Sequence, residues 1–122
     1  MAQKIAIMED EELILNLLEK KLIKEGYEIL VARNGEEGLK LIKEKKPDLL
    51  LLDIIMPLKG GFEVLEEMQK DEELKNVPVI IISNSGQPVE IDRAQKLGAK
   101  DWLIKTDFDP QEVVDKIKKQ IG

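Results

Sequence analysis

The sequence predicts an α/β protein in which a parallel β-sheet is covered by helices on both faces. Five short apolar runs alternate with five segments of helical periodicity along 122 residues. This alternation is typical of right-handed βαβ units, whose strands are parallel. The most apolar run, residues 49–52, consists of four leucines between Pro47 and Pro57. Because this run has no polar face, we expect it to form a central strand that is buried on both sides.

The first strand is expected at residues 5–8, and an acidic run, residues 9–12, follows it. A helix should come next, with Asp10 as its N-cap and Gly26 at its end. The acidic residues would suit the positive end of the helix dipole. The apolar positions that we expect along this helix are Leu13, Ile14, Leu17, Leu18 and Leu22.

The remaining strands are expected at residues 27–32, 49–52, 79–82 and 102–104. The remaining helices are expected from 35 to about 45, around 62–68, over 89–97 and from 110 onward. Their boundaries have recognisable signals. Asn34 precedes the second helix, Gly98 ends the fourth, and Asp109 before Pro110 combines an N-cap with a proline in the first turn.

Composition and charge exclude several classes of protein. Apolar residues make up 43% and charged residues 36% of the chain, which is typical of a soluble globular domain. The net charge of −6 argues against a general nucleic-acid binder, and no apolar run is long enough to span a membrane. The chain has no cysteine, which excludes disulfides and suits a reducing cytoplasm. It also has no histidine, so histidine cannot serve in catalysis or metal binding.

Polar residues stand where the predicted strands end. Glu9 and Asp10 follow the first strand, Asp53 the third, Ser83 the fourth and Lys105 the fifth. The carboxyl ends of parallel strands share one edge of the sheet, where ligands bind in open α/β folds. Three carboxylates in one place repel each other unless a cation lies among them, and Mg²⁺ suits oxygen ligands. A carboxylate that faces a metal, a lysine and a hydroxyl is arranged to become a phospho-aspartate.

Each of these residues also has a simpler interpretation when it is taken alone. Glu9 and Asp10 would suit a helix N-terminus, Ser83 would suit a turn, and most lysines, such as Lys105, lie on the surface. The phosphoryl site is the better interpretation because all of these residues follow strand ends in order.

Taken together, these residues resemble the receiver domains of two-component response regulators, including the chemotaxis-type regulators that consist of a receiver alone. The resemblance covers essentially the whole chain. The matching positions are the acidic pair Glu9 and Asp10, the acceptor Asp53, the dipeptide Met56-Pro57, the hydroxyl residue Ser83, and Lys105 after residues 98–104. The chain departs from the usual residues of the family at Gly60, Asn84, Trp102 and Thr106.

The resemblance implies a flavodoxin-like (βα)5 fold in three layers, with strand order 2-1-3-4-5 and residues 1–122 as a single receiver domain. It implies that Asp53 accepts a phosphoryl group from a sensor histidine kinase or a phosphotransfer protein, assisted by Lys105 and Ser83. Such a protein is a cytoplasmic signalling phosphoacceptor and not an enzyme that acts on other substrates. The ligands implied for Mg²⁺, the expected cofactor, are Asp10, Asp53, the Ile55 carbonyl and, through water, Glu9.

The same resemblance implies how the signal would leave the protein. The phosphoryl group would add a charge of about −1.5 to −2. This charge would draw Ser83 toward Asp53 and let Trp102 repack, so Ser83 and Trp102 are the expected switch residues. The output would pass to a downstream protein and not directly to nucleic acid or to a membrane. The expected output surface is the fourth helix, the fifth strand and the fifth helix, including Arg93, Lys96, Lys100 and Lys116.

The residues beside the acceptor predict a long-lived signal. A polar side chain near the phosphoryl group can orient the water that hydrolyses it. The positions that would hold such a side chain are Ile55, two residues after Asp53, and Ser85, two residues after Ser83. Ile55 offers no polar side-chain atom, Ser85 is short, and Asn84 adds bulk beside the same path, although its amide could instead bind the water. We therefore predict slow self-dephosphorylation, which these three residues, Ile55, Asn84 and Ser85, would tune.

One departure from the family affects the backbone. Thr106 follows Lys105 where the family usually has proline. A cis bond before a residue other than proline costs about 2.5–4 kcal/mol, so we predict a trans bond between Lys105 and Thr106.

Three other functions would use parts of this pattern. A flavodoxin-like nucleotide binder should have a glycine- or serine-rich phosphate loop after its first strand, where this chain has acids that repel phosphate. A phosphatase of the haloacid dehalogenase type normally has a second aspartate two residues after its nucleophile, where this chain has Ile55. The alternative that stays open is a receiver-like interaction module that is never phosphorylated.

Overall fold

The structure, a computed structural model, describes residues 2–107 and 109–122. The strands are β1 (Lys4–Met8), β2 (Glu28–Ala32), β3 (Leu49–Asp53), β4 (Val79–Ser83) and β5 (Asp101–Ile104). The helices are α1 (Glu12–Lys24), α2 (Gly35–Lys45), α3 (Gly61–Gln69), α4 (Pro88–Lys96) and α5 (Pro110–Ile121). Within the described ranges, every helix is too short or too polar to cross a lipid bilayer.

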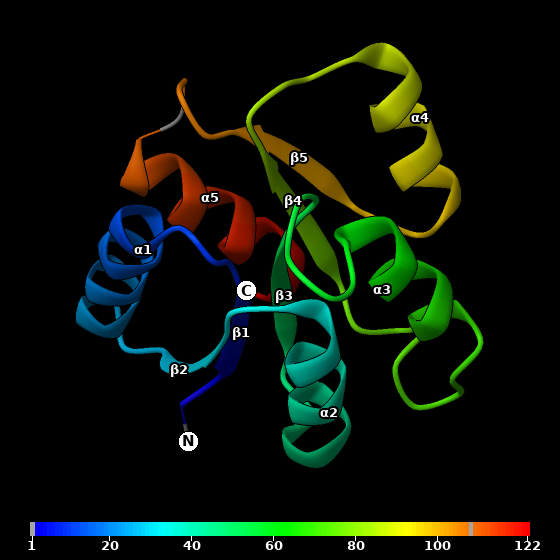
Figure 1. Ribbon diagram of the computed structural model, residues 1–122. Helices are drawn as coiled ribbons and strands as arrows, with labels where there is room; N and C mark the ends of the chain where they lie inside the picture. The colour runs from blue at the N-terminus through cyan, green and yellow to red at the C-terminus, as the bar shows by residue number, and fades with distance from the viewer. Residues whose placement is uncertain (1, 108) are drawn as a thin grey trace.

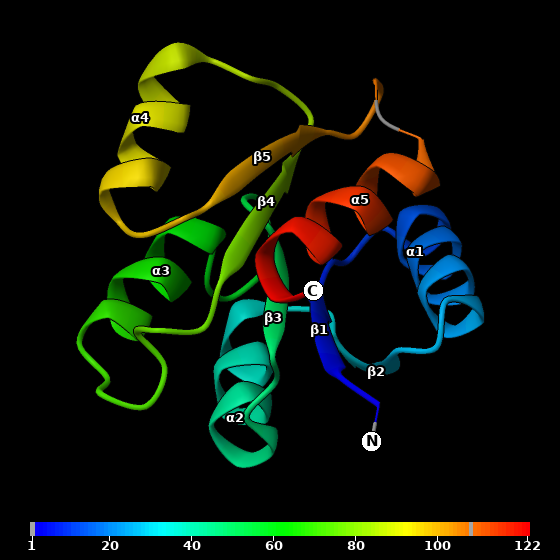
Figure 2. The same cartoon turned by 180° about the vertical axis from the view of Figure 1, so that it is seen from behind.

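The five strands are parallel and form one sheet in the order β2-β1-β3-β4-β5. Helices cover both faces of this sheet (Figures 1 and 2). α1 and α5 pack over one apolar cluster, and α2, α3 and α4 pack over the other. The flavodoxin-like three-layer fold that the sequence predicts is therefore confirmed.

The leucine strand β3 lies at the centre of the sheet, between β1 and β4. Its side chains alternate between the two faces. Leu50 and Leu52 belong to the cluster under α2, α3 and α4, whereas Leu49 and Leu51 belong to the cluster under α1 and α5. Both faces of β3 are covered, which explains why its sequence has no polar alternation. Asp53, the last residue of the strand, comes to the carboxyl edge of the sheet.

The observed bounds of the strands and of α4 differ from the expected ones by one residue. β1 begins at Lys4, β2 at Glu28 and β5 at Asp101, whereas β3 and β4 extend through Asp53 and Ser83. α4 begins at Pro88, which takes the first-turn position that proline favours. The expected order of the elements is otherwise observed along the whole chain.

The prediction that Asp10 is the N-cap of the first helix is wrong. α1 begins at Glu12 with Glu11 at the N-cap position, and no side chain caps the helix. Glu9 Oε2 accepts a hydrogen bond from the Glu11 N–H at 3.0 Å. This acidic side chain therefore bonds within the turn at the edge of the sheet and does not cap the helix. Asp10 lies in the loop before the helix and is exposed.

The buried face of α1 also differs from the expected one. Leu15, Leu18 and Leu22 are buried, whereas Leu13 and Leu17 are 86% and 46% exposed. A helix turns about 100° per residue, so Leu13 and Leu17 lie nearly opposite Leu15. Leucines occur on both sides of this helix, so its sequence alone does not determine which side faces the sheet.

The helix starts predicted at Asn34 and Asp109 are both observed, and each of these residues caps its helix. The Asn34 side chain accepts a hydrogen bond from the Glu37 N–H at 2.8 Å, at the start of α2. The Asp109 side chain accepts one from the Glu112 N–H at 2.9 Å, at the start of α5. Each cap satisfies a backbone donor that has no partner within its helix.

These caps give a prediction about stability. Asn34→Ala should lower the free energy of unfolding by about 1 kcal/mol, because it removes a cap. Asp10→Ala should cause no loss in metal-free buffer, because Asp10 caps no helix and lies among like charges. Urea unfolding of the two variants and the parent protein measures the difference. Equal losses would contradict the assignment of the caps.

Candidate functional site

The register of the sheet brings the polar strand ends together. Asp53 pairs with Ile82, the residue before Ser83, and Ser83 pairs with Ile104, the residue before Lys105. These side chains therefore meet at one edge of the sheet, where parallel strands end. The buried polar or charged residues of the described chain all lie at this edge; they are Glu9, Asp53, Ser83 and Lys105.

Lys105 is the cation at the centre of this group. Its Nζ donates hydrogen bonds to Asp53 Oδ2 and Glu9 Oε2, both at 3.1 Å. It also lies 3.3 Å from Glu11 Oε1. Burial acts to lower the pKa of Lys105, but the hydrogen bond to Glu9 and the charge of Asp53 outweigh it, so this pKa is raised. Lys105 is thus a fixed positive charge beside the Asp53 carboxylate.

The Asp53 carboxyl group is held in an environment that disfavours its charge. The residue is only 4% exposed, and its Oδ1 accepts a hydrogen bond from the Ile55 N–H at 3.4 Å. Burial, and then the charge of Glu9, raise the pKa of Asp53 to about 7, although Lys105 acts to lower it. An additional cation beside this carboxylate would favour its charged, nucleophilic form.

The carboxylates around Asp53 fit a divalent cation. Glu9, Asp10 and Asp53 each have an oxygen within 4.8 Å of the others. Among the described residues, Glu9 Oε1 is buried without a hydrogen bond, although Lys105 Nζ is 2.9 Å from it as an ion-pair partner. Oxygen ligands of this kind, few in number and open to water at Asp10, are the type that Mg²⁺ uses.

Ser83 lies at the same edge, but its hydroxyl points into the loop that follows β4. Its Oγ accepts a hydrogen bond from the Ser85 N–H at 3.4 Å. The Ser85 hydroxyl donates to Glu90 Oε1 on α4 at 3.3 Å, so that it is directed to α4. Asn84 is exposed between the two serines. The side chain of Ile55 is 73% exposed and extends into solvent.

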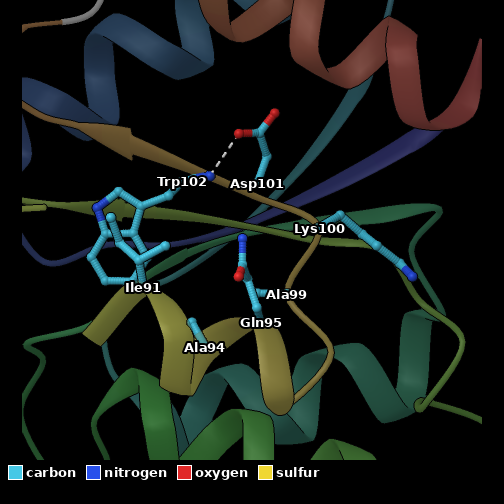
Figure 3. A pocket seen from close by; sticks show the side chains of 7 residues that line it. All are labelled: Ile91, Ala94, Gln95, Ala99, Lys100, Asp101 and Trp102. Carbon is cyan, nitrogen blue, oxygen red and sulfur yellow. Dashed lines mark hydrogen bonds between the residues drawn. The ribbon is translucent and has the colours of Figure 1, made fainter. Parts of the chain in front are cut away.

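Trp102 on β5 is hydrogen-bonded to the loop that follows β4. Its Nε1–H donates a hydrogen bond to the Ser85 carbonyl at 2.9 Å. The indole and Gln95 help to line a cavity of about 160 Å³ between α4 and β5 (Figure 3). Trp102 is half-buried, and it connects β5 to the loop that begins at Ser83. No pattern in the sequence predicts this hydrogen bond.

The four basic residues of the expected output surface have different surroundings. Arg93 lies 3.3 Å from Glu66 and therefore faces α3. Lys116 forms an ion pair with Asp101 at 2.9 Å, which joins α5 to β5. Arg93, Lys96 and Lys100 are exposed, and Lys96 lies 3.0 Å from Asp92 on the same helix. The structure thus brings these residues to the α4-β5-α5 side, where three of them, Arg93, Lys96 and Lys116, lie in ion pairs.

Two features of this edge are not predicted by the sequence. Glu11 joins the ion-pair group of Lys105, but it cannot be distinguished in sequence from the acids beside it. Leu58 adopts a φ of 68°, which a non-glycine residue rarely does. The Lys105–Thr106 bond, by contrast, is trans as predicted.

Comparisons with known proteins identify the family and the fold of the chain. The response regulator receiver domain family matches residues 5–118. A CheY-like response regulator receiver domain protein from Methanospirillum hungatei is 28% identical, with a TM-score of 0.89, and 98% of this chain and 93% of that chain are covered. The phosphorylated cyanobacterial phytochrome response regulator RcpA is 26% identical, with a TM-score of 0.84 and coverage of 98% and 91%.

The fold is also shared with a more distant protein. The receiver domain of the sensor histidine kinase PA1611 from Pseudomonas aeruginosa, with a magnesium ion in its active-site cleft, is 22% identical. Its TM-score is 0.90, and the match covers 100% of this chain and 99% of that chain. Since the family match spans nearly all of the sequence, the chain belongs to the response regulator receiver domains.

Proposed function

We propose that this receiver domain accepts a phosphoryl group on Asp53 from the phosphohistidine of a sensor histidine kinase or a phosphotransfer protein. The observation that carries the proposal is the buried Asp53 carboxylate with the Lys105 ammonium 3.1 Å away, beside the carboxylates of Glu9 and Asp10. The phosphorylated state of RcpA supports it. The proposal includes a cytoplasmic location and residues 1–122 acting as one receiver domain.

In the proposed transfer, an Asp53 carboxylate oxygen attacks the phosphorus atom of the donor. An O–P bond forms as the P–N bond to the donor imidazole breaks, and the imidazole nitrogen keeps the electron pair. Lys105 donates a hydrogen bond to a phosphoryl oxygen, and the Ser83 hydroxyl donates another after the loop moves toward Asp53. The protein thus positions the reacting groups and balances the charge of the phosphoryl oxygens.

Mg²⁺ is the cofactor in this proposal. When bound, it supplies positive charge that favours the ionised Asp53 and offsets the phosphoryl oxygens. The magnesium ion in the cleft of the PA1611 receiver supports this choice. The groups that would hold the ion are Asp10, Asp53, the Ile55 carbonyl and, through water, Glu9.

Labelling with acetyl phosphate tests the proposal. In the presence of Mg²⁺, the parent protein should gain one phosphoryl group by intact-mass spectrometry, and Asp53→Asn should gain none. The alternative is a receiver-like interaction module that is not phosphorylated. A parent protein that binds Mg²⁺ but is never labelled would favour that alternative. Labelling that survives Asp53→Asn would disprove the assignment of the acceptor.

The proposed output is a change in the loop after β4 that reaches Trp102. Movement of Ser83 toward a phosphorylated Asp53 would disturb the hydrogen bond from the Trp102 indole to the Ser85 carbonyl. A downstream protein would then bind the α4-β5-α5 surface. The basic residues of this surface are Arg93, Lys96, Lys100 and Lys116.

Trp102 makes this change measurable, because it is the only tryptophan in the chain. Adding Mg²⁺ and beryllofluoride, a phosphoryl mimic, should alter the intensity or the emission maximum of Trp102. Mg²⁺ alone and beryllofluoride with Asp53→Asn are the controls, and the second should give no change. An unchanged spectrum of the parent protein would show that Trp102 is not coupled to the acceptor.

The lifetime of the phosphorylated state is predicted to depend on Ile55. Its side chain offers no hydrogen bond to an attacking water, and Ser85 is bonded to Glu90 on α4. Ile55→Asn should therefore speed the decay of labelled protein several-fold, by orienting water near the phosphoryl group. Asn84→Ala is the companion variant, at the other side of the path by which water would reach the phosphoryl group on Asp53. Decay that is no faster in Ile55→Asn would show that other residues govern access of water.

A further inference from the structure

The ammonium group of Lys105 lies among three carboxylates. Its Nζ donates hydrogen bonds to Asp53 Oδ2 and to Glu9 Oε2, both at 3.1 Å. The third carboxylate belongs to Glu11, whose Oε1 lies 3.3 Å from the same Nζ atom. An ammonium group has three N–H donors, so these two hydrogen bonds leave one donor. Among the described residues, Glu11 is the one further ion-pair partner of Lys105.

The backbone of Glu11 is held in place, whereas its side chain makes no bond to the helix that follows. Its N–H donates a hydrogen bond to Glu9 Oε2 at 3.0 Å, and its carbonyl accepts one from the Leu15 N–H at 3.0 Å. Glu11 stands at the N-cap position of α1, but its side chain accepts no hydrogen bond from the helix. The start of the helix therefore does not explain where this side chain lies, and its contact with Lys105 does.

Glu11 differs from the rest of this group in its exposure. The side chains of Lys105, Glu9 and Asp53 are 3%, 1% and 5% exposed, whereas the side chain of Glu11 is 50% exposed. A carboxylate that leaves an ion pair needs another partner, and water is available only to an exposed group. Glu11 can therefore leave Lys105 at small cost, whereas Glu9 would become a buried, unpaired charge.

Phosphorylation of Asp53 changes which groups Lys105 must bond. In the proposed transfer, the ammonium group donates a hydrogen bond to a phosphoryl oxygen. Two of its three donors are already bonded to Glu9 and Asp53. Glu11 is the neighbour that yields at the least cost, and it is an anion like the phosphoryl group. The third N–H would then bond the phosphoryl oxygen, and water would solvate the released Glu11 carboxylate.

We infer that Glu11 competes with the phosphoryl group for Lys105 and thereby lowers the affinity of the acceptor site for phosphoryl donors. This inference rests on the proposed function and adds to it a residue that regulates the same site. Glu11 is a positioning residue, because it acts on the reaction through Lys105. Removing its carboxylate from Lys105 should make Asp53 easier to phosphorylate.

The first test measures the binding of beryllofluoride, the phosphoryl mimic, at saturating Mg²⁺. Fluorine NMR detects the bound species directly. Glu11→Gln should lower the dissociation constant about twofold to fivefold, as expected for loss of an ion pair with one exposed partner. Labelling by acetyl phosphate should become faster by a similar factor. Saturating Mg²⁺ removes any effect of the substitution on metal affinity.

Glu12→Gln is the matched control for the change in charge. Glu12 is the next residue, and it pairs with Arg33 and not with Lys105. The substitution removes the same charge from the same turn. It should leave the affinity for beryllofluoride and the labelling rate nearly unchanged, because exposed charges are screened at about 0.15 M salt. A gain in Glu12→Gln as large as in Glu11→Gln would contradict the inference.

Glu11→Asp separates competition for Lys105 from simple repulsion of an anion. It keeps the charge but withdraws the carboxylate by about 1.5 Å, the length of one C–C bond, so that contact with Lys105 is lost. Competition predicts that Glu11→Asp binds beryllofluoride about as tightly as Glu11→Gln does. An affinity equal to that of the parent protein would show that repulsion is sufficient and would overturn the inference.

A double-mutant cycle shows whether Glu11 acts through Lys105. In the Lys105→Met protein, adding Glu11→Gln should change neither the affinity for beryllofluoride nor the labelling rate. A gain as large as in the parent background would overturn the inference. A complete loss of binding in Lys105→Met that Glu11→Gln does not reverse would agree with it, and Glu11→Asp then decides between competition and repulsion.

The same measurements distinguish this inference from the proposed function. A parent protein that is labelled on Asp53 as fast as Glu11→Gln would refute the competition and leave the phosphoryl acceptor intact. Slower labelling of Glu11→Gln would show that Glu11 assists the transfer, which is the opposite of the inference. Parent and Glu11→Gln proteins that are never labelled and bind no beryllofluoride would refute the inference and the proposed function together.

Discussion

Lys105→Met is expected to lower the free energy of unfolding by about 3–5 kcal/mol in metal-free buffer, the usual cost of breaking a buried ion pair. Methionine preserves most of the side-chain volume but removes the ammonium group that bonds Glu9 and Asp53. These two carboxylates would then be buried beside each other without a cation. Urea unfolding at about pH 8 measures the loss, because the raised pKa of Lys105 keeps the parent side chain charged there.

The matched control for this experiment is Lys100→Met, since Lys100 is exposed at the start of β5. It should change the stability by less than about 0.5 kcal/mol. Adding Mg²⁺ should restore part of the stability of Lys105→Met, because a ligand that binds only the folded state stabilises it. A Lys105→Met protein as stable as Lys100→Met would contradict the role of Lys105 as the cation that holds the acidic group together.

Asp53→Asn should act in the opposite direction and raise the free energy of unfolding in metal-free buffer. The pKa of Asp53 is raised from 3.8 to about 7 by burial and by the charge of Glu9. Each unit corresponds to about 1.4 kcal/mol, so ionising Asp53 in the folded protein costs at most about 4 kcal/mol. The loss of a charge-assisted hydrogen bond from Lys105 offsets part of this gain. We expect a net stabilisation of about 2 kcal/mol at pH 8.

The sign of the pH dependence follows from the raised pKa. Between about pH 4 and pH 7, the folded protein retains a proton on Asp53 that the unfolded chain has released. The stability of the metal-free parent protein should therefore fall as the pH rises through this window, and Asp53 should add no further change above it. Asp53→Asn should lack this contribution, whereas Asp107→Asn, at an exposed position, should retain it. Identical pH profiles for all three proteins would contradict the raised pKa.

The fold could be predicted because its signals are local and repeated. The leucines of β3 have no polar face since both sides of the central strand are covered. Asn34 and Asp109 carry the chemistry of their helix caps in the side chain itself. Signals of this kind depend on a few neighbouring residues, so the local sequence contains them.

The first helix shows where such reasoning fails. Leucines lie on both sides of α1, and only contact with the sheet selects Leu15 over Leu13 as the buried residue. Asp10 has the chemistry of an N-cap, but the helix begins two residues later. Burial and helix phase here depend on tertiary packing, which the local pattern does not contain.

The candidate site likewise has one part that the sequence predicts and another part that it does not. Glu9, Asp53, Ser83 and Lys105 could be brought together from sequence, because each stands at a strand end and parallel strands share an edge. The contact of Glu11 with Lys105 depends on how the chain turns after β1. The positive φ of Leu58 depends on a loop held between two helices. Side-chain orientation and backbone strain of this kind arise only from the assembled fold.

The most direct test of Asp53 as the phosphoryl acceptor is to locate the phosphorylated residue chemically. Borohydride reduces an aspartyl phosphate to homoserine and leaves free aspartate unchanged. The protein would be treated with acetyl phosphate and Mg²⁺, reduced, digested and sequenced by mass spectrometry. We predict homoserine at position 53 and an unaltered Asp10 in the same digest. Homoserine at Asp10 or at any other acid, with Asp53 unmodified, would contradict the assignment.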